Sequence, residues 1–139
     1  MIILDSNVLS ELMRPRPDKS VVEWLARHTN DELSTTSVTI GEIWYGIERL
    51  PDGRRKAQIA EAAERATGAL RDRILPFDTA AARLYASLVA RRDRSGHPIS
   101  GFDGQIAAIC RVRDASLATR NVKDFAETGV EIINPWQSL

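Results

Sequence analysis

The sequence predicts a three-layer α/β/α sandwich with a central parallel sheet of about five strands. Two observations support this class: short apolar or Thr- and Val-rich segments alternate with helical patterns, and residues able to cap a helix follow several of them. Strands that alternate with helices form a parallel sheet covered on both faces. At 139 residues the chain has the length of one domain, and we expect residues 1–139 to form it.

The first half of the chain predicts two strands, 1–4 and 33–38. Ser6 and Thr39 are expected to cap the helices that follow them. Prolines, polar segments and a Pro-Asp-Gly turn separate the helices expected in this half, which cover 6–13, 20–30, 39–50 and 54–71.

The second half predicts three strands, 73–77, 115–119 and 130–133. Asp78 is expected to cap a long helix. The helical segments expected in this half are 79–94, 100–113 and a single turn at 121–125.

Composition excludes several classes of protein. Nineteen basic and nineteen acidic residues cancel, so the chain is not a general polyanion binder, and any contact with nucleic acid must be local. The single cysteine, Cys110, forms no internal disulfide and fits a reducing, cytoplasmic location. No apolar run approaches 18 residues, so we expect neither a signal peptide nor a membrane span.

Three acids stand where a parallel sheet gathers ligands. Asp5 follows the first strand directly, and ligands of such sheets lie beyond the carboxyl ends of the strands. Asp103 shares a helix face with Ile106 and Cys110 and so lies toward the core. Glu42 lies near a helix start. Each acid also has a structural reading: Asp5 as a turn or cap, Asp103 as a helix-end acid, and Glu42 as a solvated acid in a first turn.

A second polar group follows the strand at 115–119. Asn121 and Asp124 stand three residues apart, so they either join the acids or form a capping box for the turn at 121–125. Ser6, Asn7 and Thr119 flank these positions, and we expect them to support the site.

Together, the acids predict a divalent metal site. Carboxylates about 4 Å apart repel by about 4 kcal/mol at an effective dielectric constant of 20, so a cluster of them needs a cation or raised pKa values. A set of oxygen ligands without His or Cys selects Mg²⁺ or Mn²⁺. Such ions activate water and stabilise the charge that develops in phosphodiester cleavage.

Several motifs, in order, resemble those of PIN-domain ribonucleases. They are "ILDSNVLSEL", "TIGEIWYGIERL", "FDGQIAAI", "LATRNVKDF" and the closing "INPW", and they span Met1 to Trp136. The sequence is most similar to the VapC toxins of bacterial toxin–antitoxin pairs, and among them to the FitB-like subgroup. Each motif alone is weak evidence for the family, but several in the same order and at the family's spacing are strong evidence.

The resemblance implies a metal-dependent endoribonuclease. It implies Asp5, Glu42 and Asp103 as the residues around Mg²⁺ or Mn²⁺. The fourth catalytic position falls on Asn121, where many relatives carry Asp, and Asp124 is the alternative. The resemblance also implies an RNA substrate, with tRNA as a candidate, and a cognate antitoxin whose C-terminal tail crosses the active-site groove. Operator DNA is reached through that antitoxin, in a homodimer or higher toxin–antitoxin assembly.

Asn121 keeps a second function open. A PIN fold with weak catalysis would act mainly as a binding module that regulates its operon together with the antitoxin. A receiver-type or phosphatase domain also gathers acids at strand ends, but Asn7 occupies the position where it needs its second acid.

Two further groups have alternative interpretations. The basic run "RRDR" (91–94) leads toward the helix of Asp103 and either guides RNA or forms a solvated helix end. Trp24, Trp44 and Tyr45 are either a base-stacking platform or, as we favour, core and a protein-binding surface.

Overall fold

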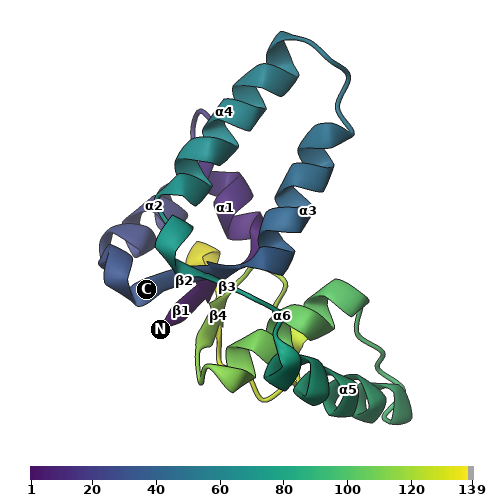
Figure 1. Ribbon diagram of the computed structural model, residues 1–139. Helices are drawn as coiled ribbons and strands as arrows, with labels where there is room; N and C mark the ends of the chain where they lie inside the picture. Colours follow the sequence, from purple (N-terminus) through teal and green to yellow (C-terminus); the bar gives the residue numbers. More distant parts are fainter. Residues whose placement is uncertain (138–139) are drawn as a thin grey trace.

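The computed structural model describes residues 1–137 and confirms a five-stranded, all-parallel sheet between two layers of helices (Figure 1). The strand order is β3-β2-β1-β4-β5. Residues 138 and 139 of the expected domain lie outside the described residues. The strands are β1 (Ile2–Leu4), β2 (Leu33–Thr36), β3 (Ile74–Leu75), β4 (Ser116–Ala118) and β5 (Ile132–Ile133).

The helices fall where the sequence predicts them, with ends shifted by a few residues. They are α1 (Ser6–Leu12), α2 (Lys19–Ala26), α3 (Ser37–Glu48), α4 (Arg54–Gly68), α5 (Thr79–Arg94) and α6 (Gly101–Val112). Short 3₁₀ turns form η1 (Asn30–Glu32), η2 (Arg71–Arg73), η3 (Val122–Phe125) and η4 (Pro135–Gln137). No helix within residues 1–137 is long and apolar enough to cross a bilayer.

Two predicted helix caps are wrong by one and three residues. Asp5, not Ser6, caps α1, and its Oδ1 accepts a hydrogen bond from the Ser6 backbone N over 2.8 Å. Thr36, not Thr39, caps α3, and its hydroxyl accepts from the Thr39 backbone N over 3.0 Å. In both places the strand passes into the helix without a loop, so the residue at the strand end is itself the cap.

Successive side chains of each strand point to opposite faces of the sheet, and this produces two separate hydrophobic cores. Ile3 of β1 and Leu117 of β4 pack in a core with α5 and α6, whereas Leu4 and Ala118 pack in a second core with α1 to α4. In Figure 1 the helices α1, α3 and α4 accordingly lie on the opposite side of the sheet from α5 and α6.

The strand order places a crevice beside β1. The chain runs outward from β1 through β2 to β3, and then returns to β4 on the other side of β1. Ligands of parallel sheets bind where the strand order reverses in this way. Asp5 follows β1 and Thr119 follows β4, and the Asp5 backbone N donates to the Ala118 carbonyl over 3.0 Å.

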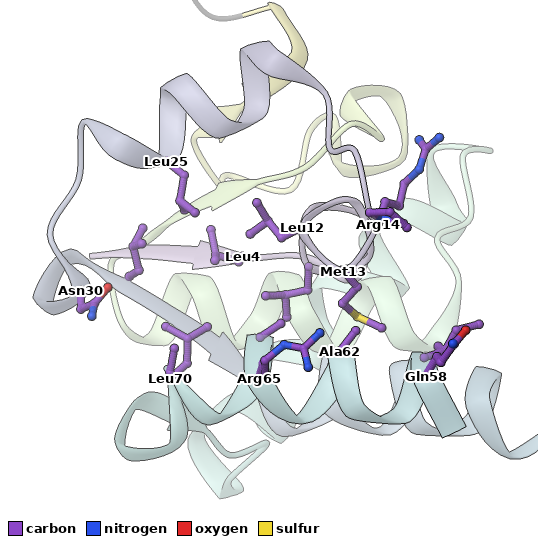
Figure 2. A pocket seen from close by; sticks show the side chains of 16 residues that line it. Leu4, Leu12, Met13, Arg14, Leu25, Asn30, Gln58, Ala62, Arg65 and Leu70 are labelled. Carbon is purple, nitrogen blue, oxygen red and sulfur yellow. The ribbon is translucent and has the colours of Figure 1, made fainter. Parts of the chain in front are cut away.

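A cavity of about 810 Å³ lies away from this crevice, among α1, α2, α4 and the sheet. Figure 2 shows Leu4, Leu12, Leu25 and Leu70 around it, with the side chain of Arg65 among them. None of the predicted site acids lines this cavity, whose lining combines leucines with Arg14 and Arg65.

Candidate active site at the ends of β1 and β4

Asp5 is held rigidly at the end of β1. Its side chain is buried, with 3% of the residue surface exposed. One carboxylate oxygen accepts from the Ser6 backbone N, and the other, Oδ2, accepts from the Thr119 hydroxyl over 2.8 Å. Because hydrogen bonds fix both oxygens, the orientation of this carboxylate is set before any ligand arrives.

Thr119 links the two strand ends. Besides donating to Asp5, its fully buried hydroxyl accepts from Nδ2 of Asn7 and from the backbone N of Asn121, each over 3.1 Å. The backbone N of Arg120 in turn donates to Oδ1 of Asn7 over 3.2 Å. The structure therefore brings Asn7, Thr119 and the backbone of Asn121 close to Asp5.

The interpretation of Glu42 as a solvated acid in the first turn of a helix is wrong. Since α3 begins at Ser37, Glu42 is its sixth residue and lies in the second turn. It lines a cavity of about 320 Å³ together with Ser6 and Ser10 of α1. Its Oε1 is buried and has no hydrogen-bond partner among the described residues. A buried carboxylate oxygen without a partner is costly, so this atom is suited to receive a cation or a hydrogen-bond donor.

The acids influence one another's protonation. Burial, followed by the charges of Asp5 and Asp103, raises the pKa of Glu42 to about 7. Burial also raises the pKa of Asp5, against its hydrogen bonds to Thr119 and Ser6, and Asp124 adds to the rise. Asp5, Glu42, Asp103 and Asp124 therefore lie close enough to interact through their charges, and we call this group of four the acid mouth.

Asp103 and Asp124 complete this mouth. Ser100 caps α6 by accepting from the Asp103 backbone N over 3.2 Å, which fixes Asp103 in the first turn. Burial raises the pKa of Asp103, which outweighs a hydrogen bond to Ser100, and the charges of Asp5 and Asp124 raise it further. Asp124 is exposed in η3.

The capping box, one of the two interpretations of Asn121 and Asp124, does not form. Asn121 precedes η3, but its side chain makes no capping hydrogen bond. Its backbone N is occupied by Thr119, so the loop follows the strand end rather than a helix cap. Both side chains are exposed and line a neighbouring cavity.

The donor set fits a hard divalent cation. Asp5, Glu42 and Asp103 supply only oxygen, and Glu42 Oε1 lacks a partner. Within residues 1–137, no three side chains of His, Cys, Asp and Glu are already arranged to hold a metal ion. Coordination by these acids therefore requires side-chain rotation. Asp5 is held by its hydrogen bonds, whereas no hydrogen bond holds Oε1 of Glu42.

Arg92 is a structural residue that sequence analysis missed. It is 7% exposed, so neither reading of "RRDR" holds for it. Its guanidinium donates to the carbonyls of His97 over 2.6 Å, Ala126 over 2.5 Å and Asp124 over 3.4 Å. It thus joins the loop before α6 to the turn that carries Asp124. Its spacing of four residues from the buried Leu88 could have revealed this position.

The aromatic residues divide between core and surface. Trp24 is buried in the core with α1 to α4, and Trp44 packs against that core. Tyr45 is exposed and lies near the guanidinium of Arg49. The three therefore do not form one stacking platform.

Comparison with known proteins decides the family. The profile of the PIN domain matches residues 2–131. The chain belongs to the PIN-domain family. This PIN domain is 38% identical over 138 residues to VapC ribonuclease Y4jK of Sinorhizobium fredii, covering 99% of each chain. It is 35% identical over 137 residues to toxin FitB of Neisseria gonorrhoeae, covering 98% of this chain and 99% of FitB.

The fold agrees with the same relatives. A solved structure of FitAB bound to an IR36 DNA fragment matches this PIN domain with a TM-score of 0.91 at 34% identity. The match covers 100% of this chain and 98% of the other. The resemblance to VapC and FitB toxins is therefore confirmed at the level of sequence and of fold.

Proposed function

We propose that this PIN domain is a metal-dependent endoribonuclease toxin of a toxin–antitoxin pair. The observation that carries the proposal is the convergence of Asp5, Glu42 and Asp103, with the buried Oε1 of Glu42 left without a partner. The similarity to VapC ribonuclease Y4jK supports RNA as the substrate, and tRNA is a candidate.

Each residue has a distinct task in this proposal. Mg²⁺ or Mn²⁺ bound at the acids would supply Lewis acidity and an activated water. Asp5 offers a carboxylate of fixed orientation, because Ser6 and Thr119 hold it. Glu42 gains or loses its proton near neutral pH, so cation binding releases a proton there. Asp103 adds a carboxylate from the first turn of α6.

The same proposal includes the partners. FitAB is a complex that binds DNA, and we infer that this chain likewise joins a cognate antitoxin and reaches operator DNA through it. We expect a homodimer or a higher toxin–antitoxin assembly. The cytoplasm, where RNA and operator DNA are both present, is the proposed location.

Thermal unfolding tests the cation site. Adding Mn²⁺ should raise the melting temperature of the unaltered protein, because a ligand that binds only the folded state stabilises it. Asp103→Asn should abolish this rise while leaving the metal-free protein folded. The matched control is Asp72→Asn, because this exposed acid lies at the amino end of β3, whereas Asp5 follows the carboxyl end of β1 in the same parallel sheet. Equal Mn²⁺-induced shifts in the unaltered protein and Asp103→Asn would defeat the assignment.

Asn121 favours the second candidate, a weakly catalytic binding module. Its exposed amide brings no charge to the fourth catalytic position that the resemblance to PIN-domain ribonucleases implies. In that case Asn121→Asp should create or strengthen cleavage, whereas the unaltered protein should cleave RNA no faster than Asp5→Asn.

A further inference from the structure

We propose that a cavity beside the acids, between η3 and the turn at Asn134–Gln137, is a subsite for a backbone phosphate of single-stranded RNA, held by Arg120 and Lys123. This proposal rests on the proposed ribonuclease function and names how the substrate continues past the reacting phosphate. The cavity has a volume of about 470 Å³, which lies in the range of small-ligand sites.

The lining of this cavity suits a nucleotide. Arg120 and Lys123 provide two cations, and Asn121, Asn134 and Gln137 provide amides. Cations bind phosphate oxygens, and amides can hydrogen-bond to sugar hydroxyls and base edges. Asp124 also lines the cavity and belongs to the acid mouth, so the two sites are contiguous.

Arg120 is fixed in position relative to Asp5. Its backbone N donates to Asn7, and Asn7 and Asp5 are both hydrogen-bonded to the Thr119 hydroxyl. Its guanidinium carbon lies 4.9 Å from the ring centroid of Trp136. A guanidinium over an aromatic ring keeps its in-plane N–H groups for other acceptors, as a phosphate requires.

Arg120 and Lys123 are not paired with the acids nearby. Within residues 1–137, neither Arg120 nor Lys123 forms an ion pair with a carboxylate. Both side chains are exposed. They therefore remain available to an anion from outside.

RNA is the occupant that the surroundings favour. The chain has no net charge, and the acid mouth repels a polyanion, so binding of RNA needs cations placed along its path. A strand whose reacting phosphate lies at Asp5 and Asp103 continues to further phosphates on either side. The cavity offers one of them a site in which two cations, Arg120 and Lys123, outnumber the single carboxylate of Asp124.

The binding test compares two double variants with the same change in charge. Arg120→Gln/Lys123→Gln alters the cavity, and Arg54→Gln/Arg55→Gln alters two exposed cations in the first turn of α4, neither of which lines the cavity. Both are made in an Asp103→Asn background, so that RNA is bound without cleavage. The probe is a fluorescein-labelled single-stranded RNA of about 12 nucleotides, followed by anisotropy at several salt concentrations.

The expected result is specific to the cavity. Removing the site for one phosphate should reduce the slope of log affinity against log salt concentration by about 0.7, because each neutralised phosphate of a single strand contributes about 0.7. When Arg120→Gln/Lys123→Gln is made with Asp103 intact, KM for RNA should rise and kcat should stay nearly unchanged. The control variant should match its parent in both measurements, and melting temperatures should be equal.

Other outcomes overturn the proposal. If the parent binds and cleaves RNA but the cavity variant keeps its salt slope and KM, the subsite is wrong while the ribonuclease function stands. If only the affinity for the antitoxin falls, the cavity binds that protein and not RNA. If the unaltered protein neither binds nor cleaves RNA, the proposed function fails and the subsite fails with it.

Discussion

The hydroxyl of Thr119 donates a hydrogen bond to Oδ2 of Asp5 over 2.8 Å, with both residues buried. This bond joins the carboxyl ends of β4 and β1, which are neighbours in the sheet. The hydroxyl also accepts from Asn7 and from the backbone of Asn121. One buried oxygen therefore sets the positions of three residues at the candidate site.

Thr119→Val should weaken both stability and metal binding. The substitution keeps the shape of the side chain but leaves Asp5 Oδ2 and two donors without their partner, which costs about 1–3 kcal/mol in free energy of unfolding. It also removes a hydrogen bond that lowers the pKa of Asp5, so Mn²⁺ should bind more weakly at neutral pH. Urea unfolding and Mn²⁺ titration measure the two effects. Thr119→Ser, which keeps the hydroxyl, should retain most Mn²⁺ affinity; equal losses in Ser and Val would refute this role.

Glu42 should make the metal-free protein less stable as pH rises. The folded-state pKa of about 7 lies above the ordinary value of 4.5, so the folded protein binds more protons than the unfolded chain between these values. The free energy of unfolding therefore falls as pH rises from 4.5 to about 7. Asp5 and Asp103 shift in the same direction and steepen the fall.

Glu42→Gln should reduce this dependence without removing it. Thermal unfolding in the presence of a chelator should show a flatter profile, with the variant more stable than the unaltered protein at about pH 8. Glu64→Gln, at an exposed position on α4, is the control and should leave the profile as it is. A Glu42→Gln profile as steep as that of the unaltered protein would show that Glu42 ionises without cost.

Arg92 should be important for stability although it does not belong to the acid mouth. Arg92→Gln removes charged hydrogen bonds to three carbonyls and should lower the free energy of unfolding by about 2–4 kcal/mol. The neighbouring Arg91 is exposed, and Arg91→Gln should change it by about 0.5 kcal/mol or less. Urea unfolding of both variants measures these changes. Similar small decreases in the free energy of unfolding would show that the buried contacts of Arg92 contribute little.

Two glycines should respond in opposite directions to substitution by alanine. A Cβ at Gly104 would lie 2.9 Å from Val89 and 3.0 Å from Tyr85, so Gly104→Ala should force α5 and α6 apart and cost about 1–3 kcal/mol. At Gly41 no atom lies within 4 Å, and Gly41→Ala should stabilise α3 by about 0.5–1 kcal/mol. Thermal unfolding measures both. A stabilising Gly104→Ala would show that the helix contact is loose.

The sequence was sufficient for the layers and most of the elements. Apolar strands and amphipathic helices depend on local periodicity, which a single sequence displays. The chain also indicated that the carboxyl ends of β1 and β4 carry polar residues, since Asp5 and Thr119 follow their strands directly. Local pattern could not predict the residue at which α3 begins. Its cap, Thr36, stands in a run of similar residues, "LSTTSV", and the sequence does not distinguish it from Thr39.

Packing and hydrogen bonds that no local periodicity displays explain the remaining errors. Glu42 appears solvated from periodicity alone, but it lines a cavity shared with α1, and its Oε1 is buried. Asn121 has the residue type of a cap, but Thr119 occupies its backbone N. Arg92 stands in a run of charges, and only the approach of residues 124–126, more than thirty positions later, explains its burial.

RNA cleavage by the purified protein, free of antitoxin, tests the central claim most directly. The measurement compares the unaltered protein with Asp5→Asn on single-stranded RNA, with Mn²⁺ and with a chelator. We predict cleavage only by the unaltered protein and only with Mn²⁺, with a loss of at least about a hundredfold in rate in the variant. Equal cleavage by both proteins, or undiminished cleavage in the chelator, would contradict the account.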